Sequence, residues 1–218
     1  MINDPLKANV LSCRFIPKVK ESLAKELDLP PGHHSIGIFT ADSDDVAYAA
    51  LDEATKKTDI TVVYAKSFYG GAANANSPLA GEVIGIISGP DPSEVKTALD
   101  AINHIINSGA ISFISANDDD SIAYFAHCVN KTGSYLSNLA QVDRGTSLAY
   151  LIAPPAEAIY ALDLALKTAD VEIAVFYGPP SETNYGGALL KGSQSACEAA
   201  CCAFAQGVKE VARRPISG

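Results

Sequence analysis

In the second half of the chain, short apolar runs alternate with segments in which apolar residues recur at helical spacing. Leu148–Ala153 is a compact apolar run that predicts a buried strand, and the two prolines after it favour the start of a helix. Ile159 and Leu162 begin a series at helical spacing, which predicts a helix of about three turns that ends at Thr168. Val171–Tyr177 is β-branched and aromatic and predicts the next strand.

A turn-rich loop at residues 178–184 follows, and Gly186–Leu190 predicts another strand. After a turn at residues 191–193 a second helix is predicted, whose alanines would let it approach a sheet closely. The first half repeats this order. Its predicted elements are strands at Ile36–Thr40, Ile60–Tyr64 and Val83–Ile87, helices at Asp44–Lys57 and Ser93–Ile106, and a loop at Gly70–Pro78.

Each half also begins with a leader segment. We expect a strand at Asn9–Phe15 and a helix at about Lys18–Glu26 in the first half. In the second half we expect a strand at Ala110–Ser115 and a helix at about Asp120–Val129. Each half is therefore predicted as β-α-β-α-β-β-α.

The two halves also match residue by residue. Ser35, Ala41, Asp45 and Tyr48 align at one constant separation with Ser147, Ala153, Glu157 and Tyr160. So long a separation indicates two copies of a domain and not a solenoid, whose repeats span roughly 20–50 residues. We expect domains at residues 1–108 and 109–218, each an α/β fold of the α+β sandwich kind, with helices on one side of a sheet.

Composition narrows the possible functions. The 218 residues carry a net charge of −9, which argues against nucleic-acid binding because phosphates require a basic surface. Hydrophobic residues make up 48% of the chain, enough for packed cores, yet no apolar run approaches the roughly 20 residues of a membrane span. The N-terminal residues lack the basic start and apolar stretch of a signal peptide, so we expect a cytosolic protein with no membrane association.

Neither the cysteines nor the histidines form a recognisable metal or disulfide pattern. The five cysteines are Cys13, Cys128, Cys197, Cys201 and Cys202. Their number is odd and two on one helical face do not close a metal site, so we interpret them as free thiols that are mostly buried in the core. The four histidines share no metal-binding spacing, and no phosphate-binding glycine motif is present. No metal, cofactor or catalytic residue is predicted.

The repeated unit resembles a bacterial microcompartment shell domain, through its small-residue helix ending in Lys167-Thr-Ala-Asp-Val171, its strand–loop–strand and its second glycine-led helix. The leader in each copy resembles the circularly permuted form of that domain. Within the family, the chain is similar to the tandem shell proteins of ethanolamine utilisation. The motifs that carry this similarity are Ala41-Asp-Ser-Asp-Asp-Val46, Asp52-Glu-Ala-Thr-Lys56, Ala80-Gly-Glu82, Lys131-Thr-Gly-Ser-Tyr-Leu136, Ala153-Pro-Pro155, Pro180-Ser-Glu-Thr-Asn-Tyr185 and Gly192-Ser-Gln194.

The resemblance implies a structural protein and not an enzyme. Such chains are expected to form homotrimers that mimic hexamers, and to join other shell proteins in a hexagonal layer around enzymes in the cytoplasm. The resemblance further implies a gated central pore for a metabolite or cofactor, small pores within each subunit, and ethanolamine binding at the small pore that biases the gate.

Two explanations are open for Asp44 and Asp45, which begin the first long helix. Acidic residues there complement the helix dipole, and Ser43 stands where a cap is expected. The second half starts its equivalent helix with prolines and only Glu157, which weakens that explanation. The resemblance implies that both aspartates, with Glu82, bind the ammonium of ethanolamine, which needs carboxylate and carbonyl acceptors. Alone, Glu82 would be a solvated charge at a strand end.

The resemblance assigns further residues to the same ligand. An aromatic on a strand is usually a core residue, yet Phe113 is implied to contribute to the small-pore wall. A polar turn that would otherwise be a surface turn is implied to complete the ligand shell through Glu182, Thr183, Asn184 and Tyr185.

The segment Ser67–Ser77 is long, small and glycine-containing, which is typical of mobile functional loops. We predict that it forms part of the central gate, and the alternative is a surface loop of no consequence. The predicted gate residues are Phe68, Tyr69, Gly70, Gly71 and Asn74.

Three functional hypotheses follow. The first is a shell tile with a gated pore, and the second is a cytosolic amine-binding sensor that does not form shells. The third is an enzyme, which no nucleophile–base pair or metal cluster supports.

Overall fold

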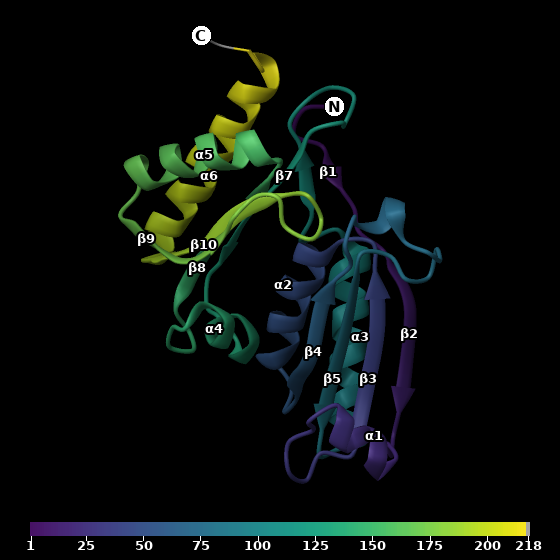
Figure 1. Cartoon of the computed structure of the whole chain (residues 1–218). Coiled ribbons are helices and arrows are strands. Elements are labelled where there is room, and N and C mark those ends of the chain that lie inside the picture. Colours follow the sequence, from purple (N-terminus) through teal and green to yellow (C-terminus); the bar gives the residue numbers. More distant parts are fainter. Residues whose placement is uncertain (217–218) are drawn as a thin grey trace. The chain divides into compact units, whose positions relative to one another are not determined.

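The computed structural model describes residues 1–216 as two compact units, and each is treated by itself below (Figure 1). Unit 1 comprises Met1–Leu6, Ser112–Thr132 and Ser137–Gly218. Unit 2 comprises Lys7–Ile111 and Gly133–Leu136. The predicted boundary after Ser108 stays a prediction.

Unit 2 is a four-stranded antiparallel sheet in the order β2-β3-β5-β4. Its elements are β2 (Val10–Ile16), α1 (Glu21–Glu26), β3 (Ser35–Ala41), α2 (Asp44–Thr55), β4 (Thr61–Ser67), a 3-10 turn η1 (Ala72–Asn74), β5 (Val83–Gly89) and α3 (Pro92–Ser108). Helices α2 and α3 pack together against the sheet (Figure 1).

Alternating residues of β3 supply two packing surfaces in unit 2. A Cβ on Gly37 would lie 2.6 Å from Leu99 Cγ, so the glycine lets α3 approach the strand. Ile36 is fully buried and packs in a second cluster with Val19 and Ile86, against which α1 contributes Ala24. Because neighbouring strand residues point to opposite faces, this second cluster lies on the face opposite the one that α3 approaches, and α1, which has no buried residue, reaches it only through Ala24.

Asp52 fastens the segment Gly133–Leu136 to α2 within unit 2. Its carboxylate is fully buried and accepts hydrogen bonds from the backbone N–H groups of Gly133 and Leu136, both at 2.8 Å. Lys56 lies 3.3 Å from the same carboxylate. Asp52 thus supplies acceptors for backbone donors at the beginning of α4 (Ser134–Ala140), where a helix needs them.

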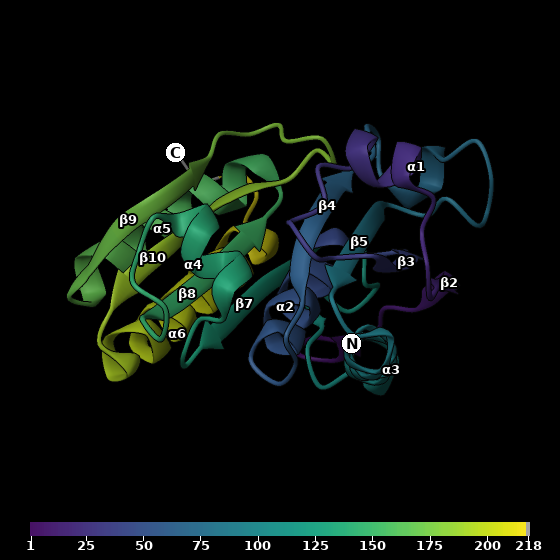
Figure 2. The same cartoon turned by 90° about the horizontal axis from the view of Figure 1, so that it is seen from below.

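Unit 1 is a six-stranded antiparallel sheet in the order β1-β6-β7-β8-β10-β9. Its strands are β1 (Pro5–Leu6), β6 (Phe113–Ser115), β7 (Ala123–Val129), β8 (Ser147–Ala153), β9 (Val171–Tyr177) and β10 (Gly186–Gly192). Helices α5 (Pro155–Thr168) and α6 (Gln194–Arg213) pack against each other and against this sheet (Figure 2).

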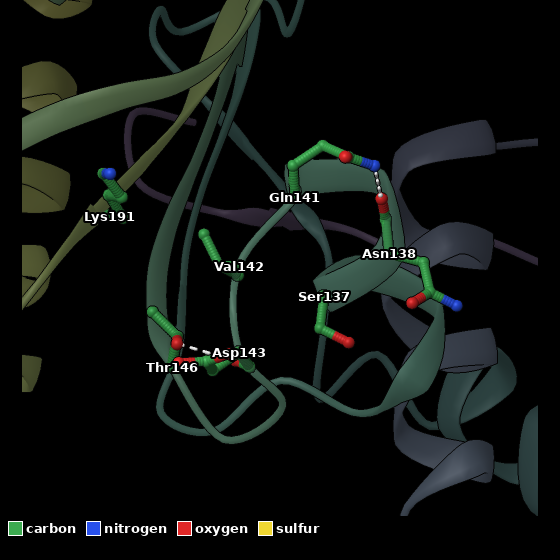
Figure 3. Close-up of a pocket in the computed structure, with 7 residues that line it drawn as sticks. All are labelled: Ser137, Asn138, Gln141, Val142, Asp143, Thr146 and Lys191. Atoms are coloured by element: carbon green, nitrogen blue, oxygen red, sulfur yellow. Dashed lines mark hydrogen bonds between the residues drawn. The ribbon is translucent and has the colours of Figure 1, made fainter.

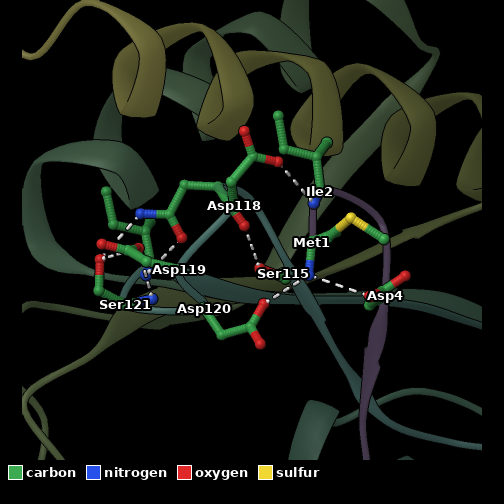
Figure 4. A network of polar contacts seen from close by, with 10 residues as sticks. Met1, Ile2, Asp4, Ser115, Asp118, Asp119, Asp120 and Ser121 are labelled. Atoms are coloured by element: carbon green, nitrogen blue, oxygen red, sulfur yellow. Dashed lines mark hydrogen bonds and ion pairs between the residues drawn. The ribbon is translucent and has the colours of Figure 1, made fainter.

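The first residues of the chain are held to unit 1 by a polar network (Figure 4). The Met1 ammonium lies 2.9 Å from Asp4 Oδ2 and 3.0 Å from Asp120 Oδ1. Strand β1 pairs with β6, where Pro5 lies opposite Ile114. The carboxylates raise the pKa of the N-terminal ammonium, chiefly by accepting its hydrogen bonds.

The predicted order of elements holds in the core of both halves, but the second leader was wrong. Asp120–Val129, predicted as a helix, contains strand β7, which pairs with β8. Helix α4 instead begins at Ser134. Tyr124 and Phe125 are aromatic strand formers whose side chains are buried in the structure. Strand β7 in unit 1 therefore corresponds to β2 in unit 2.

Within residues 1–216, no helix is long and apolar enough to cross a membrane.

Candidate functional site

Glu82 stands where the ends of two strands of unit 2 meet. Its backbone N–H donates to the carbonyl of Ala41 at 2.8 Å, and its carbonyl accepts from the N–H of Phe68 at 2.7 Å. Gly81 precedes it with φ +63°, and a Cβ there would lie 2.3 Å from the oxygen of Ala41. Only glycine fits this turn, so Gly81 fixes where the Glu82 side chain starts.

The Glu82 carboxyl group connects helix α2 with the loop that follows β4. Oε1 accepts a hydrogen bond from the N–H of Asp44 at 3.1 Å, and Oε2 accepts from the N–H of Ala72 at 3.4 Å. Gly71, with φ +67°, lies beside this carboxyl group, and a Cβ on it would be 2.9 Å from Oε2; the positive φ is what favours a glycine there. The Glu82 side chain therefore accepts hydrogen bonds from backbone N–H groups of both the first turn of α2 and the 3-10 turn η1.

Asp44 and Asp45 are both 6% exposed at the start of α2. Asp44 Oδ1 accepts from the N–H of Asp45 at 2.8 Å, and Oδ2 accepts from the Ser67 hydroxyl at 2.7 Å. The Ser67 hydroxyl is also 2.6 Å from the hydroxyl of Tyr48. Donors on α2 and β4, the N–H of Asp45 and the hydroxyl of Ser67, thus fix the Asp44 carboxylate.

The capping explanation is only partly right. Ser43 occupies the N-cap position but its side chain makes no cap hydrogen bond. Its hydroxyl oxygen is buried and, among the residues the structure describes, has no hydrogen-bond partner. Glu82, which is distant in sequence, binds the free N–H of Asp44 instead.

Asp44 and Glu82 do not readily carry a negative charge at the same time. Burial, the neighbouring Asp44 charge and a side-chain hydrogen bond to Asp44 together raise the pKa of Glu82 to about 7, with burial as the largest cause. Within residues 1–216, neither Asp44 nor Glu82 forms a salt bridge. Acidic groups whose pKa is raised by burial and by a neighbouring charge concentrate at functional sites.

The loop after β4 contains the predicted gate residues. Gly70 and Gly71 both have positive φ, and Asn74 Nδ2 donates to the carbonyl of Gly70 at 2.8 Å. Tyr69 is 86% exposed, so its ring has little contact within the chain. The N–H of Gly71 donates to the carbonyl of Phe68 at 3.1 Å. The loop therefore consists of tight local turns, with Glu82 bound to it through Ala72.

The other predicted ligand residues lie in unit 1 and form their own group. The rings of Phe113 and Tyr185 have centroids 5.8 Å apart. The turn that contains Glu182 is closed by hydrogen bonds from the N–H of Ser181 to the carbonyl of Tyr185 and from the N–H of Asn184 to the carbonyl of Ser181. Asn184 has φ +69°, and Thr183 is 9% exposed. The predicted turn is thus confirmed as a turn.

The predicted residues therefore fall into two groups. The structure brings Asp44, Asp45 and Glu82 together in unit 2, and Phe113 with Tyr185 in unit 1. Sequence reasoning placed Ser43 beside the acidic residues as a cap but missed Ser67, whose hydroxyl donates to Asp44. A small polar residue at a strand end carries no signal of its own, because only the fold shows which helix it faces.

A polar cavity of about 580 Å³ lies elsewhere in unit 1 (Figure 3). Its lining residues are Ser137, Asn138, Gln141, Val142, Asp143, Thr146 and Lys191. The Lys191 ammonium lies 3.1 Å from Glu172, and Gln141 donates to the carbonyl of Asn138. None of the predicted ligand residues lines this cavity.

No metal centre is found among residues 1–216, where no group of three or more His, Cys, Asp or Glu side chains could hold an ion. Cys197 and Cys201 are buried, as predicted, while Cys202 is exposed and Cys13 and Cys128 are partly buried. Burial raises the pKa of the Cys128 thiol to about 11, and it raises that of Cys201 as well. Thiols with raised pKa values are poor nucleophiles at neutral pH.

Two units that repeat one order of strands and helices, with a strand and short helix as leader, define the class of protein. The family model described as "BMC domain", the domain of bacterial microcompartment shell proteins, matches residues 35–116. The solved structure of PduB, called a trimeric bacterial microcompartment shell protein, shares the fold at 18% identity, with a TM-score of 0.74 and coverage of 94% of this chain and 89% of that one.

Closer relatives specify the branch of the family. The chain is 58% identical over 216 residues to the shell protein EutL of Clostridium perfringens, covering 99% of both chains. It is 66% identical to the solved structure of the ethanolamine utilization protein EutL from Leptotrichia buccalis, with a TM-score of 0.98 and full coverage of both chains. The chain belongs to the EutL family of bacterial microcompartment shell proteins. It is a structural protein of the ethanolamine-utilisation microcompartment, located within the cytoplasm, and not an enzyme.

Proposed function

We propose that the chain assembles as a homotrimer, and that the trimer is a tile with a central pore in a hexagonal layer of shell proteins. The support is the duplication: three chains with two homologous domains each supply six domains around one axis. Closed cyclic symmetry then gives a pseudo-six-fold tile that can sit beside hexameric neighbours. Because the two copies differ in sequence, the tile carries three copies of each specialised feature.

The acidic pair of unit 2 is the proposed ethanolamine site. Ethanolamine carries an ammonium group with three donors and a hydroxyl group. Asp44, Asp45 and Glu82 offer carboxylate acceptors on neighbouring segments, and charge-assisted hydrogen bonds to carboxylates are the strong ones. The observation that carries this proposal is that a buried carboxyl group, Asp44, and a partly buried one, Glu82, lie together, and no lysine or arginine among residues 1–216 forms a salt bridge with either.

A second set of ligand residues is proposed in unit 1. Phe113, Glu182, Thr183, Asn184 and Tyr185 form an aromatic pair and a closed polar turn, both built for a fixed geometry. Two variants test their contribution separately. Thr183→Val removes a hydroxyl group and Glu182→Gln removes a charge, and both keep the size of the side chain. Ethanolamine should bind more weakly to each variant than to the parent chain.

The proposed gate is the loop that carries Phe68, Tyr69, Gly70, Gly71 and Asn74. Glu82 gives it a physical connection to the ligand site, because Oε2 accepts from the loop at Ala72 while Oε1 accepts from α2. A ligand that competes for Glu82 has a different affinity for the loop arrangement in which Glu82 is bound to Ala72 and for one in which it is not. Such a difference in affinity is the only means by which a ligand shifts a gate.

Calorimetric titration with ethanolamine tests the site. Binding heat is expected with the parent chain and should be lost with Asp45→Ala and Glu82→Ala. Asp100→Ala, which removes an exposed carboxylate paired with Lys96, is the matched control and should bind as the parent does. Choline is the control ligand, because its quaternary ammonium has no N–H donors. Unchanged binding by both site variants would contradict the assignment.

Electron microscopy separates the tile from the alternative of an amine sensor that forms no shells. Extended hexagonal layers of the purified protein are expected for a tile. Discrete particles at every concentration and salt condition would favour the sensor. The mass in solution should be that of three chains in either case.

A further inference from the structure

The Asp44–Glu82 pair is built to hold a positive charge but contains none of its own. Asp44 is held by the N–H of Asp45 and the hydroxyl of Ser67, and Glu82 is held by the N–H groups of Asp44 and Ala72. All of these donors are neutral. Two neighbouring carboxylates that are largely shielded from water repel each other, so one of them keeps a proton until a cation arrives.

The charged groups around Glu82 make this conclusion firmer. Helix α2 presents Asp44 and Asp45, which are both acidic. Beyond the end of β3, Asp42 accepts from the N–H and side-chain amide of Asn9. On β4 the nearest lysine in sequence, Lys66, has its ammonium 5.4 Å from the ring of Tyr64. Among residues 1–216, no lysine or arginine acts on Glu82, so nothing but a proton or an external cation neutralises the pair.

We propose that a primary ammonium ligand enters the Asp44–Glu82 pair in exchange for the proton that the pair holds, so that ligand binding and proton release are one event. This inference rests on the proposed ethanolamine site and specifies its chemistry. The O–H bond of the Glu82 carboxyl breaks, the proton passes to solvent, and the ammonium N–H groups donate to the carboxylate oxygens. Charge is conserved, because one monocation replaces another.

The exchange makes affinity depend on pH in a defined direction. The pKa of Glu82 lies at about 7, so protons compete with the ligand below that value and not above it. The ligand keeps its own charge throughout, because primary ammonium groups titrate near pH 10. The apparent dissociation constant should therefore rise about tenfold from pH 8 to pH 6. A shell site of this kind binds ethanolamine well in a neutral cytosol and releases it on acidification.

Calorimetry of the full chain with ethanolamine, in buffers with different ionisation enthalpies, tests the exchange. Binding should release about 0.9 proton at pH 6, about 0.5 at pH 7 and about 0.1 at pH 8. Glu82→Gln should abolish the release at every pH, and Asp44→Asn should reduce it at pH 7 because the repelling charge is gone. Glu26→Gln, at an exposed position in the same unit, should leave it unchanged.

The outcomes are distinguishable. If ethanolamine binds with heats that do not depend on the buffer, the exchange is wrong and the proposed site stands. If Glu82→Gln still releases protons on binding, the exchange belongs to another group and the assignment to Glu82 fails. If neither ethanolamine nor methylammonium binds at any of the three pH values, both the site and the exchange are overturned.

Discussion

Replacing Glu82 by glutamine should change the stability of the fold in a pH-dependent way. Glutamine keeps the shape and one oxygen acceptor of the side chain but cannot ionise. In the parent chain, Glu82 must lose its proton beside Asp44 as the pH rises through about 7. The variant avoids that cost, so it should gain stability relative to the parent at high pH.

The magnitude follows from the two pKa values. Glu82 titrates near 4.5 when solvated and at about 7 in the fold. Between these values the folded chain binds the extra proton, so the stability of the parent falls as pH rises from about 4.5 through about 7. At about 1.4 kcal/mol per pH unit the full effect is roughly 3 kcal/mol, and partial exposure of Glu82 lowers the expected value to about 2 kcal/mol.

Urea unfolding at fixed protein concentration measures this effect at pH 5 and pH 8. The free energy change caused by Glu82→Gln should be more favourable by about 2 kcal/mol at pH 8 than at pH 5. Fixed concentration is needed because assembly adds to apparent stability. Glu26→Gln, at an exposed position, is the control and should show no such difference. If the two pH values give the same change for Glu82→Gln within about 0.5 kcal/mol, the raised pKa is refuted.

Two further predictions concern the framework of unit 2. Asp52→Asn leaves one of two buried backbone donors without an acceptor and should lower the free energy of unfolding in urea by about 2–3 kcal/mol. The control Asp100→Asn, at an exposed ion pair, should lower it by less than about 0.5 kcal/mol. Equal losses of stability in the two variants would show that burial is not the cause. Gly81→Ala places a Cβ against the Ala41 carbonyl and should lower the midpoint of thermal unfolding far more than the control Gly32→Ala. Gly32 also has a positive φ, of +84°, but open space around it. Equal shifts of the midpoint would mean that backbone strain alone, and not the clash, decides the loss of stability.

Part of the fold was predictable from local pattern. The runs at Leu148–Ala153 and Val171–Tyr177 lie in strands β8 and β9, because short apolar or β-branched runs between turn residues are typical of strands. The leader of the second half was not predictable in this way. Residues 120–129 were predicted as a helix, and only their pairing with β8 in the fold shows a strand there. Strand propensity depends on neighbours that the local sequence does not contain.

The candidate site divides in the same manner. Asp44 and Asp45 stand out in the sequence because two acids follow a strand and precede a helix, so local chemistry alone marks them. Ser43 was expected to cap that helix and does not, since Glu82 takes the place of the cap from 38 positions away. Pattern and composition cannot foresee such a contact, because it depends on where two strands end in space.

The sequence by itself determined that the chain is a duplicated α/β fold with acidic residues at the start of one helix. Repeats and hydrophobic periodicity can be read along the chain without knowing which segments meet in space. Tertiary structure decided that Glu82 meets Asp44 and that the same carboxyl group reaches the loop at Ala72. The raised pKa of Glu82 exists only in that arrangement. Burial and the proximity of a second charge are properties of the folded chain, and no single residue carries them.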